Sequence, residues 1–277
     1  MISALKFGVA NAIPPVKGNP NLVTQPKSCI KVTFLIWVVL GGSLFLPASA
    51  WSQEEDTGLL RSLQTDSPMV ENTYYLQATF NNDTSPYHGL YLYGEGLFAL
   101  AKDWGVEANF PTLLTKQPLG QNPAVLGPIG LSLRYEAWHF GGWSSPTAGA
   151  FSIQGGGAYG FSNKSFPSVG SSWSLEALGG VRVGKFFLQG NYGYQGGIDS
   201  RVSDEWQANT SLGWRLGSDW FVQAEADFSA SSGPSNGTSW SYIPQIAFQP
   251  GDWLFEFGES LNGSPRGFTE FMVARAL

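Results

Sequence analysis

The chain has 277 residues, of which 13% are charged, 14% are aromatic and 35 are glycine, and its formal net charge is −6. So many aromatic residues exclude a disordered acidic chain, a single cysteine excludes a disulfide scaffold, and a mean hydropathy of −0.07 excludes a bundle of apolar membrane helices. The composition favours an all-β protein, and the acidic balance argues against nucleic acid as a partner.

The first fifty residues are predicted to be a leader that is removed. Residues 32–46 are uncharged and almost wholly apolar, Lys27 and Lys31 precede them, and residues 47–50 (PASA) follow. A basic flank, an apolar core and a small-residue end are typical of a secretory signal peptide. A single transmembrane anchor is the alternative, although the stretch is short for spanning a bilayer.

Cleavage after Ala50 changes the chemistry open to the remaining chain. The leader, residues 1–50, holds four of the 15 basic residues, none of the 21 acidic ones and the one cysteine, Cys29, so the rest carries a formal net charge of −10 and no thiol. A disulfide or a thiolate metal site is therefore excluded, and we predict no metal and no other cofactor. We expect residues 51–72 to form a periplasmic lead-in and residues 73–277 to form one folded domain.

Apolar and polar residues alternate from residue 73 onward. Between Trp206 and Leu216, for example, every second residue is polar or glycine. This period predicts strands with one apolar and one polar face. Several segments have 11 to 13 residues, whereas globular strands have about 5 or 6 and tilted membrane strands about 9–11. Twelve strands are predicted, near residues 73–80, 89–101, 104–113, 128–140, 149–161, 172–183, 185–194, 205–216, 219–229, 239–249, 252–260 and 268–276.

The connections between these segments alternate in length. Tight turns are predicted at residues 102–103, 184–185, 217–218 and 250–251, longer polar loops follow the intervening strands, and residues 141–148 break the rule. Short turns at one rim and long loops at the other are typical of outer-membrane barrels. We therefore predict a single antiparallel up-and-down transmembrane β-barrel of about twelve strands in the bacterial outer membrane, surrounded by its lipid, with both termini on the periplasmic side.

Tryptophans lie at the ends of the predicted strands, in two sets. Tyr and Trp favour a membrane interface because the ring is apolar while its polar tip stays hydrated. The two sets therefore predict two interface belts, with packing under the loops of a soluble protein as the alternative. The belt residues are Trp104, Trp220 and Trp253 after short turns, and Trp173, Trp206 and Trp240 after long loops.

Three segments resemble the outer-membrane barrels that are grouped as "MetA-pathway of phenol degradation" transporter-like proteins. They are residues 103–111 (DWGVEANFP), 128–138 (PIGLSLRYEAW) and 243–263 (IPQIAFQPGDWLFEFGESLNG), and the resemblance extends over about residues 74–277. The Gly-Asp step expected before the fourth strand is here Gly127-Pro128. The resemblance implies a monomeric outer-membrane barrel that moves small hydrophobic or aromatic compounds, and it implies no particular functional residue.

The polar faces of the strands predict what lines the interior of the barrel. The excess of one charge in a low-dielectric wall concentrates counter-ions, so a cation or a neutral solute would pass more easily than an anion. Alternatively these groups pair and fill a narrow lumen, because twelve strands lie between filled and open barrels. The predicted lumen residues are Glu95, Glu107, Arg134, Glu136, Glu176, Arg182, Arg215, Glu225, Asp227, Glu256 and Glu270, with Trp138 and Phe187 as bulky inward residues.

No catalytic residue is predicted. The two histidines are His88 in a loop and His139 at a strand end on the expected outward face, and neither has the neighbouring serine of a barrel phospholipase. We expect a non-enzymatic, monomeric channel or transporter for passive or facilitated diffusion of small solutes. The alternatives are a structural or lipid-hydrolysing outer-membrane barrel with a closed lumen, and a soluble secreted β-sheet binding protein.

Overall fold

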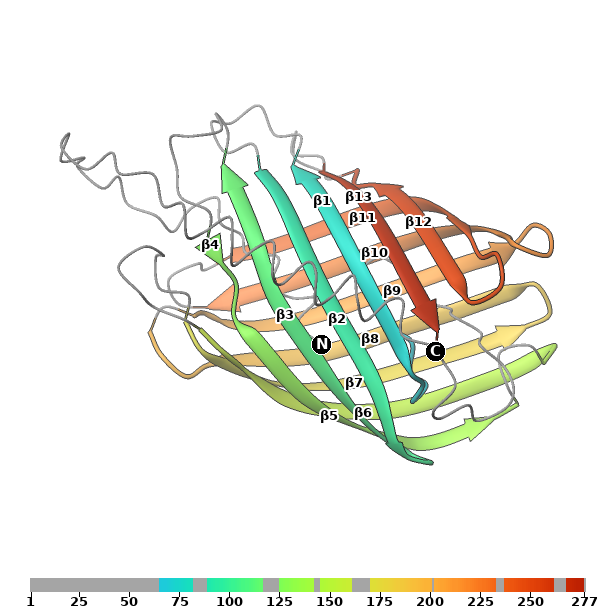
Figure 1. Ribbon diagram of the computed structural model, residues 1–277, viewed down its shortest axis with the longest axis horizontal. Helices are drawn as coiled ribbons and strands as arrows, with labels where there is room; N and C mark the ends of the chain where they lie inside the picture. Colours follow the sequence, from blue (N-terminus) through green and yellow to red (C-terminus); the bar gives the residue numbers. More distant parts are fainter. Residues whose placement is uncertain are drawn as a thin grey trace.

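The computed structural model (Figure 1) describes residues 65–81, 89–116, 125–141, 145–160, 170–200, 202–232, 237–261 and 268–276. The predicted leader, residues 51–64 and His88 lie outside these ranges. The strands are β1 (Thr73–Asn81), β2 (Gly89–Ala101), β3 (Trp104–Lys116), β4 (Val125–Leu126), β5 (Ile129–Phe140), β6 (Thr147–Tyr159), β7 (Ser172–Val183), β8 (Phe186–Gly197), β9 (Asp204–Arg215), β10 (Trp220–Ser232), β11 (Gly237–Phe248), β12 (Trp253–Glu259) and β13 (Phe268–Ala276).

The strands close into one antiparallel barrel. β1 pairs with β2 on one side and with β13 on the other, and each later wall strand pairs with its neighbours in the chain. The two-residue β4 lies beside β3, which pairs directly with β5, so the closed wall has 12 strands. Closure by the β1–β13 ladder satisfies the backbone groups that an open sheet edge would expose.

The predicted fold is confirmed, and the predicted strand bounds lie within three residues of the observed ones. Departures of three residues occur at the ends of β3, β8 and β10, and the one at β3 lies in the long connection predicted after residue 113. There β3 continues to Lys116 and Leu113 and Leu114 pair with β4. Apolar residues inside a predicted loop thus extend the sheet.

One rim of the barrel carries the short connections. β5 ends and β6 begins at this rim with six residues between them, so this connection remains longer than the other turns of the rim, as predicted. β1 begins and β13 ends at the same rim. Two of its turns contain Gly184 and Gly251, with φ of 61° and 64°, a left-handed conformation that glycine adopts without a steric penalty.

The two faces of the wall have opposite polarity. On β5, Ser132 and Arg134 face the interior and are 2% and 1% exposed, whereas Leu131 and Leu133 face outward and are 59% and 46% exposed. A closed barrel with apolar side chains outside and polar ones inside is suited to span a bilayer, because its backbone is fully paired and its outer face matches hydrocarbon. The protein is therefore a barrel of the bacterial outer membrane.

A β-bulge near the end of β5 changes the direction of two predicted side chains. Glu136 pairs with Ser152 on β6, but Trp138 pairs with Phe151, so Ala137 is an extra residue. The bulge shifts the alternation by one position. Trp138, predicted to point inward, is 54% exposed on the outer face. His139, predicted on the outward face, lies instead on the inward register opposite Ala150.

Apolar residues also gather inside the barrel, toward the rim with short turns. Phe187 and Phe221 follow two of these turns and contact each other edge to face, with ring centroids 6.1 Å apart. Gly213 leaves room for Phe187, because a Cβ there would lie 2.0 Å from the ring. Leu254 and Met272 belong to the same buried cluster. The interior is therefore polar at mid-height and apolar near the short-turn rim.

None of the residues that the structure describes belong to a helix long and apolar enough to cross a membrane.

Candidate functional site

The predicted inward carboxylates lie inside the barrel wall. Seven of the predicted acidic side chains are at most 6% exposed, as is Arg134. They come from strands all round the wall, because the inward register of each strand carries a polar residue at mid-height. The buried acidic residues of the prediction are Glu95, Glu107, Glu136, Glu176, Glu225, Glu256 and Glu270.

Three further predicted lumen residues lie nearer the two ends of the barrel. Arg182 donates to the carbonyl of Gly184 at 3.1 Å, and Arg215 donates to that of Gly217 at 2.9 Å. Both guanidinium groups thus bind the short turns at the rim instead of mid-lumen groups. Asp227 is half-buried in the other half of β10 and accepts a hydrogen bond from Ser241 at 2.9 Å.

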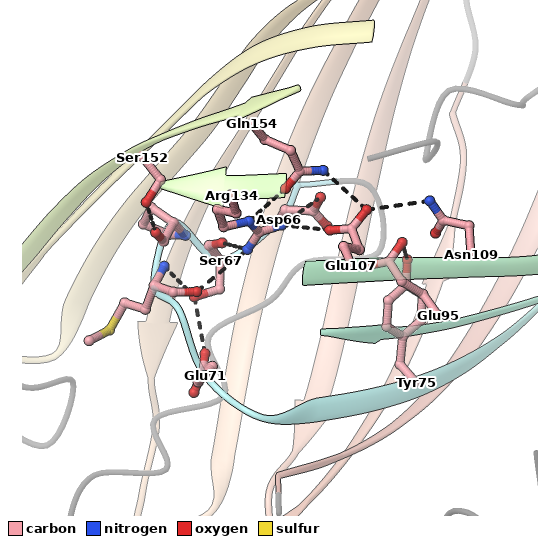
Figure 2. Close-up of polar contacts among 12 residues, drawn as sticks. Asp66, Ser67, Glu71, Tyr75, Glu95, Glu107, Asn109, Arg134, Ser152 and Gln154 are labelled. Carbon is pink, nitrogen blue, oxygen red and sulfur yellow. Dashed lines mark hydrogen bonds and ion pairs between the residues drawn. The ribbon is translucent and has the colours of Figure 1, made fainter. Parts of the chain in front are cut away.

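Arg134 is the centre of the polar network drawn in Figure 2. Its Nη2 lies 2.7 Å from Glu107 Oε2, and its Nε donates to Gln154 Oε1 at 2.6 Å. Gln154 donates in turn to Glu107 Oε1 at 3.1 Å, and Asn109 donates to the same oxygen at 3.4 Å. Glu107 is thus held by three side chains from three strands, β3, β5 and β6.

A second carboxylate, Glu95, lies beside this network and is held by two tyrosines. The hydroxyls of Tyr75 and Tyr93 donate to Glu95 Oε2 at 2.6 and 2.7 Å. The Tyr93 hydroxyl also contacts Asn109, so the two groups are continuous. One oxygen each of Asp66, Glu95 and Glu107 lies within 4.8 Å of the others. Arginine, tyrosine and amide donors already bind Glu95 and Glu107, so this arrangement is explained by hydrogen bonding alone.

Residues 65–72, part of the predicted periplasmic lead-in, lie inside the barrel. Thr65 and Asp66 are fully buried. The Asp66 carboxylate lies 3.7 Å from Arg134 Nη2, and Arg134 Nη1 donates to the carbonyl of Ser67 at 2.8 Å. Figure 2 shows this segment passing beside Gln154 and Glu107. The segment therefore belongs to the interior network.

Four further contacts connect the segment to the wall. The Ser152 hydroxyl donates to the carbonyl of Pro68, and the backbone N–H of Val70 donates to Glu136 Oε2 at 2.8 Å. The Thr65 hydroxyl donates to Glu225, and the Asn72 side-chain oxygen accepts the N–H of Ala99 at 2.8 Å. The contacts reach strands β2, β5, β6 and β10. The contacts reach separate parts of the wall, because three strands lie between β6 and β10.

His139 and Glu136 are in close contact toward the short-turn rim. His139 Nδ1 lies 2.6 Å from Glu136 Oε1, and the histidine side chain is 40% exposed. The other Glu136 oxygen holds Val70. A continuous series of contacts therefore connects His139 through Glu136 to residues 65–72. It depends on the bulge, which turns His139 inward.

The far side of the interior carries carboxylates bound to amides and a hydroxyl. Gln245 donates to Glu225 Oε2 at 2.7 Å, and Gln223 contacts Glu256. Thr79 donates to Glu270 at 3.0 Å. Neutral donors of this kind satisfy a carboxylate's hydrogen bonds and add no positive charge themselves.

The buried charges are strongly unbalanced. Among the residues that the structure describes, eight buried carboxylates, Asp66 and the seven predicted ones, face a single buried basic side chain, Arg134. A low-dielectric wall focuses the field of such an imbalance.

The six predicted belt tryptophans lie on the outward register at the two rims. All are exposed on the outer face apart from Trp253, which is half-buried. The guanidinium of Arg275 lies 5.3 Å from the ring centroid of Trp253, a cation–π contact on the outer face at the short-turn rim. This placement is the one that interfacial belts require.

Sequence reasoning missed the groups that hold the carboxylates. Gln154, Asn109 and Tyr75 share the inward period with the predicted acids, and this period was the signal that could have identified them. Residues 65–72 carry no such signal, because no period relates them to the wall.

Comparison with known proteins shows the fold and no more. No protein-family model matches the chain, and no curated protein matches it significantly, so the resemblance to the MetA-pathway group rests on the three sequence segments. Similar solved structures include the KdgM porin, with 8% identity and a TM-score of 0.46 over 74% of this chain and 99% of that one. The CymD monoaromatic hydrocarbon channel has 9% identity and a TM-score of 0.37 over 75% and 88%. The translocator domain of the autotransporter NalP from Neisseria meningitidis has 12% identity and a TM-score of 0.40 over 89% and 95%.

Proposed function

We propose that the protein is an outer-membrane channel through which small cationic or neutral solutes diffuse passively. The observation that carries the proposal is the unbalanced interior, where eight buried carboxylates meet one buried arginine in the described residues. A stable barrel that only anchors a surface structure has no need of so many buried carboxylates, since the burial of charge opposes folding. A permeation path for cations uses negative charge along its wall.

The class of solute is set by two parts of the lumen. Carboxylates and amides at mid-height would hydrogen-bond a polar or charged group, and the apolar cluster around Phe187 and Phe221 would contact a hydrocarbon part. This combination suits a small amphipathic solute, and it is compatible with the hydrophobic or aromatic compounds that the MetA-pathway resemblance implies. The barrel closes on itself through the β1–β13 ladder, so a monomer is sufficient for the proposed function.

A closed structural barrel is the second candidate. The position of residues 65–72 inside the lumen favours it, because this segment occupies space that a solute would need. A lipid hydrolase has less support. His139, the histidine that the structure describes, pairs with a carboxylate at 2.6 Å and lies on the inner face, away from the lipid.

Planar-bilayer recording tests the channel proposal. In a salt gradient the wild-type channel is expected to give a cation-selective reversal potential. Glu225→Gln with Asp227→Asn should reduce this potential, because both carboxylates lie on the inward register of β10. Glu259→Gln is the matched control, because this exposed residue lies on the outward register of β12. Equal reversal potentials in all three proteins would reject the lumen assignment, and no conductance would favour the closed barrel.

A further inference from the structure

We propose that residues 65–72 are a displaceable plug, which closes the lumen when it is seated against Arg134 and opens the channel when it leaves. This inference rests on the proposed channel function. The plug is defined here as Thr65 to Asn72.

The plug crosses the lumen instead of lying along one wall. Pro68 is bound by Ser152 on β6, whereas Thr65 is bound to Glu225 on β10. Strands β7, β8 and β9 separate these two in the closed wall, and Figure 1 shows these strands forming one side of the barrel. Four consecutive residues therefore bridge well-separated parts of the wall at mid-height, where a solute would pass.

The barrel wall is complete without the plug. The ladder between β1 and β13 begins at Thr73, one residue after the plug ends, and runs to Asn81. No plug residue belongs to a strand of the described sheet. The segment can therefore move without breaking the sheet that spans the membrane.

The hydrogen bonds of the plug are polar and replaceable, and beside them the plug has the ion pair of Asp66 with Arg134 and the packing of Met69 against the buried apolar cluster. Arg134 binds the carbonyl of Ser67, Ser152 binds that of Pro68, and Glu136 accepts the N–H of Val70. Water can take the place of such partners in a hydrated lumen, so each bond contributes only a small net stabilisation. A segment held by a few bonds of this kind is suited to exchange between seated and released states.

The direction of release follows from the end of the plug that remains attached. Asn72 accepts the N–H of Ala99 near the short-turn end of β2, and the next residue begins β1 at the same rim. This rim carries the chain termini and is the periplasmic one in barrels of this type. The plug therefore leaves toward the periplasm, with Asn72 as the hinge.

A reporter cysteine and a release variant test the plug. In the full chain with Cys29→Ser, Ser67→Cys places one thiol in the plug at a buried position. Val70→Pro removes the N–H that Glu136 accepts, and Ser152→Ala removes the hydroxyl that binds Pro68. Val70→Ala alone is the matched control, because it keeps the N–H. Heat-dependent migration in SDS shows whether each variant forms the barrel.

Release should expose the thiol and open the channel together. We expect a membrane-impermeant maleimide to label the Val70→Pro/Ser152→Ala protein at least tenfold faster than the reporter protein, and its mean conductance in planar bilayers to rise several-fold. The Val70→Ala control should match the reporter protein in both. If the double variant forms no barrel, Asp66→Asn with Ser152→Ala removes a charge near Arg134 and the same hydroxyl, and it should act in the same direction.

Three results would overturn the inference, and they differ in what they say of the channel. Fast labelling in the reporter protein would show that the segment is not seated. Faster labelling in the release variant with unchanged, measurable conductance would show that the segment does not block the path, and the channel proposal would stand. Faster labelling with no conductance in any variant would refute the plug and the channel together.

Discussion

Replacing Arg134 should destabilise the barrel more than any other single change inside it. Arg134 is 1% exposed and Glu107 is fully buried, and their charged groups lie 2.7 Å apart. Arg134→Met keeps an unbranched side chain and removes the charge and every donor. Glu107 then stays buried without the guanidinium and keeps the amides of Gln154 and Asn109 as partners.

The magnitude follows from what the buried groups lose. Removing one partner of a buried ion pair costs about 3–5 kcal/mol, because the other charge stays in a low-dielectric place. Asp66, at 3.7 Å, loses the positive charge of Arg134 as well, and the carbonyl of Ser67 loses its donor. We therefore expect Arg134→Met to lower the free energy of unfolding by about 4 kcal/mol.

Denaturant unfolding of the barrel in detergent micelles, followed by tryptophan fluorescence, measures this effect. The double variant Arg134→Met/Glu107→Gln is the matched control, because it removes both charges. It should recover most of the lost stability, since replacing a whole buried pair by neutral groups is often neutral or stabilising. An Arg134→Met protein within about 1 kcal/mol of wild type, or a double variant less stable than the single one, would refute the buried pair.

Three further changes test other parts of the fold by denaturant unfolding, the first in lipid bilayers and the other two in detergent micelles. Leu212→Arg, on the exposed outer face at mid-strand, should cost about 2–4 kcal/mol in a lipid bilayer, whereas Leu216→Arg at the rim should cost about 0–1 kcal/mol; equal costs would contradict the lipid-facing orientation. Gly213→Ala should cost about 1–3 kcal/mol because its Cβ would lie 2.0 Å from the Phe187 ring, and Phe187→Leu in the same chain should restore part of the loss. Gly184→Ala, at a φ of 61° in open space, should cost about 1 kcal/mol, while Gly217→Ala, also in open space, should change little.

The strands could be predicted because each has to keep one side in lipid and the other in a polar lumen. This requirement makes apolar and polar residues alternate along every wall strand. The bounds of β2, β7 and β13 match the prediction at both ends. The same period placed Glu107, Arg134 and Glu225 on the inner face, where they lie. Period and turn length together are thus enough for the fold of such a barrel.

The period alone could not predict where the alternation slips. The bulge after Glu136 adds one residue to β5, and it sends Trp138 outward and His139 inward. A bulge depends on how one strand pairs with its neighbour, and no residue type in β5 indicates where it occurs. The contact between His139 and Glu136 follows from that local geometry and was therefore not predictable from the sequence.

The position of residues 65–72 depends on the width and the charge of the barrel interior, which the period of the strands does not give. A barrel of twelve strands is wider than the eight-stranded barrels that side chains fill, and narrower than the open ones of sixteen. Side chains from the wall can neutralise few of the charges across such a width, and Arg134 donates from Nη1 to the carbonyl of Ser67. The wall therefore leaves polar groups that a short segment can satisfy, and the choice between a pore and a filled barrel reduces to whether that segment is seated.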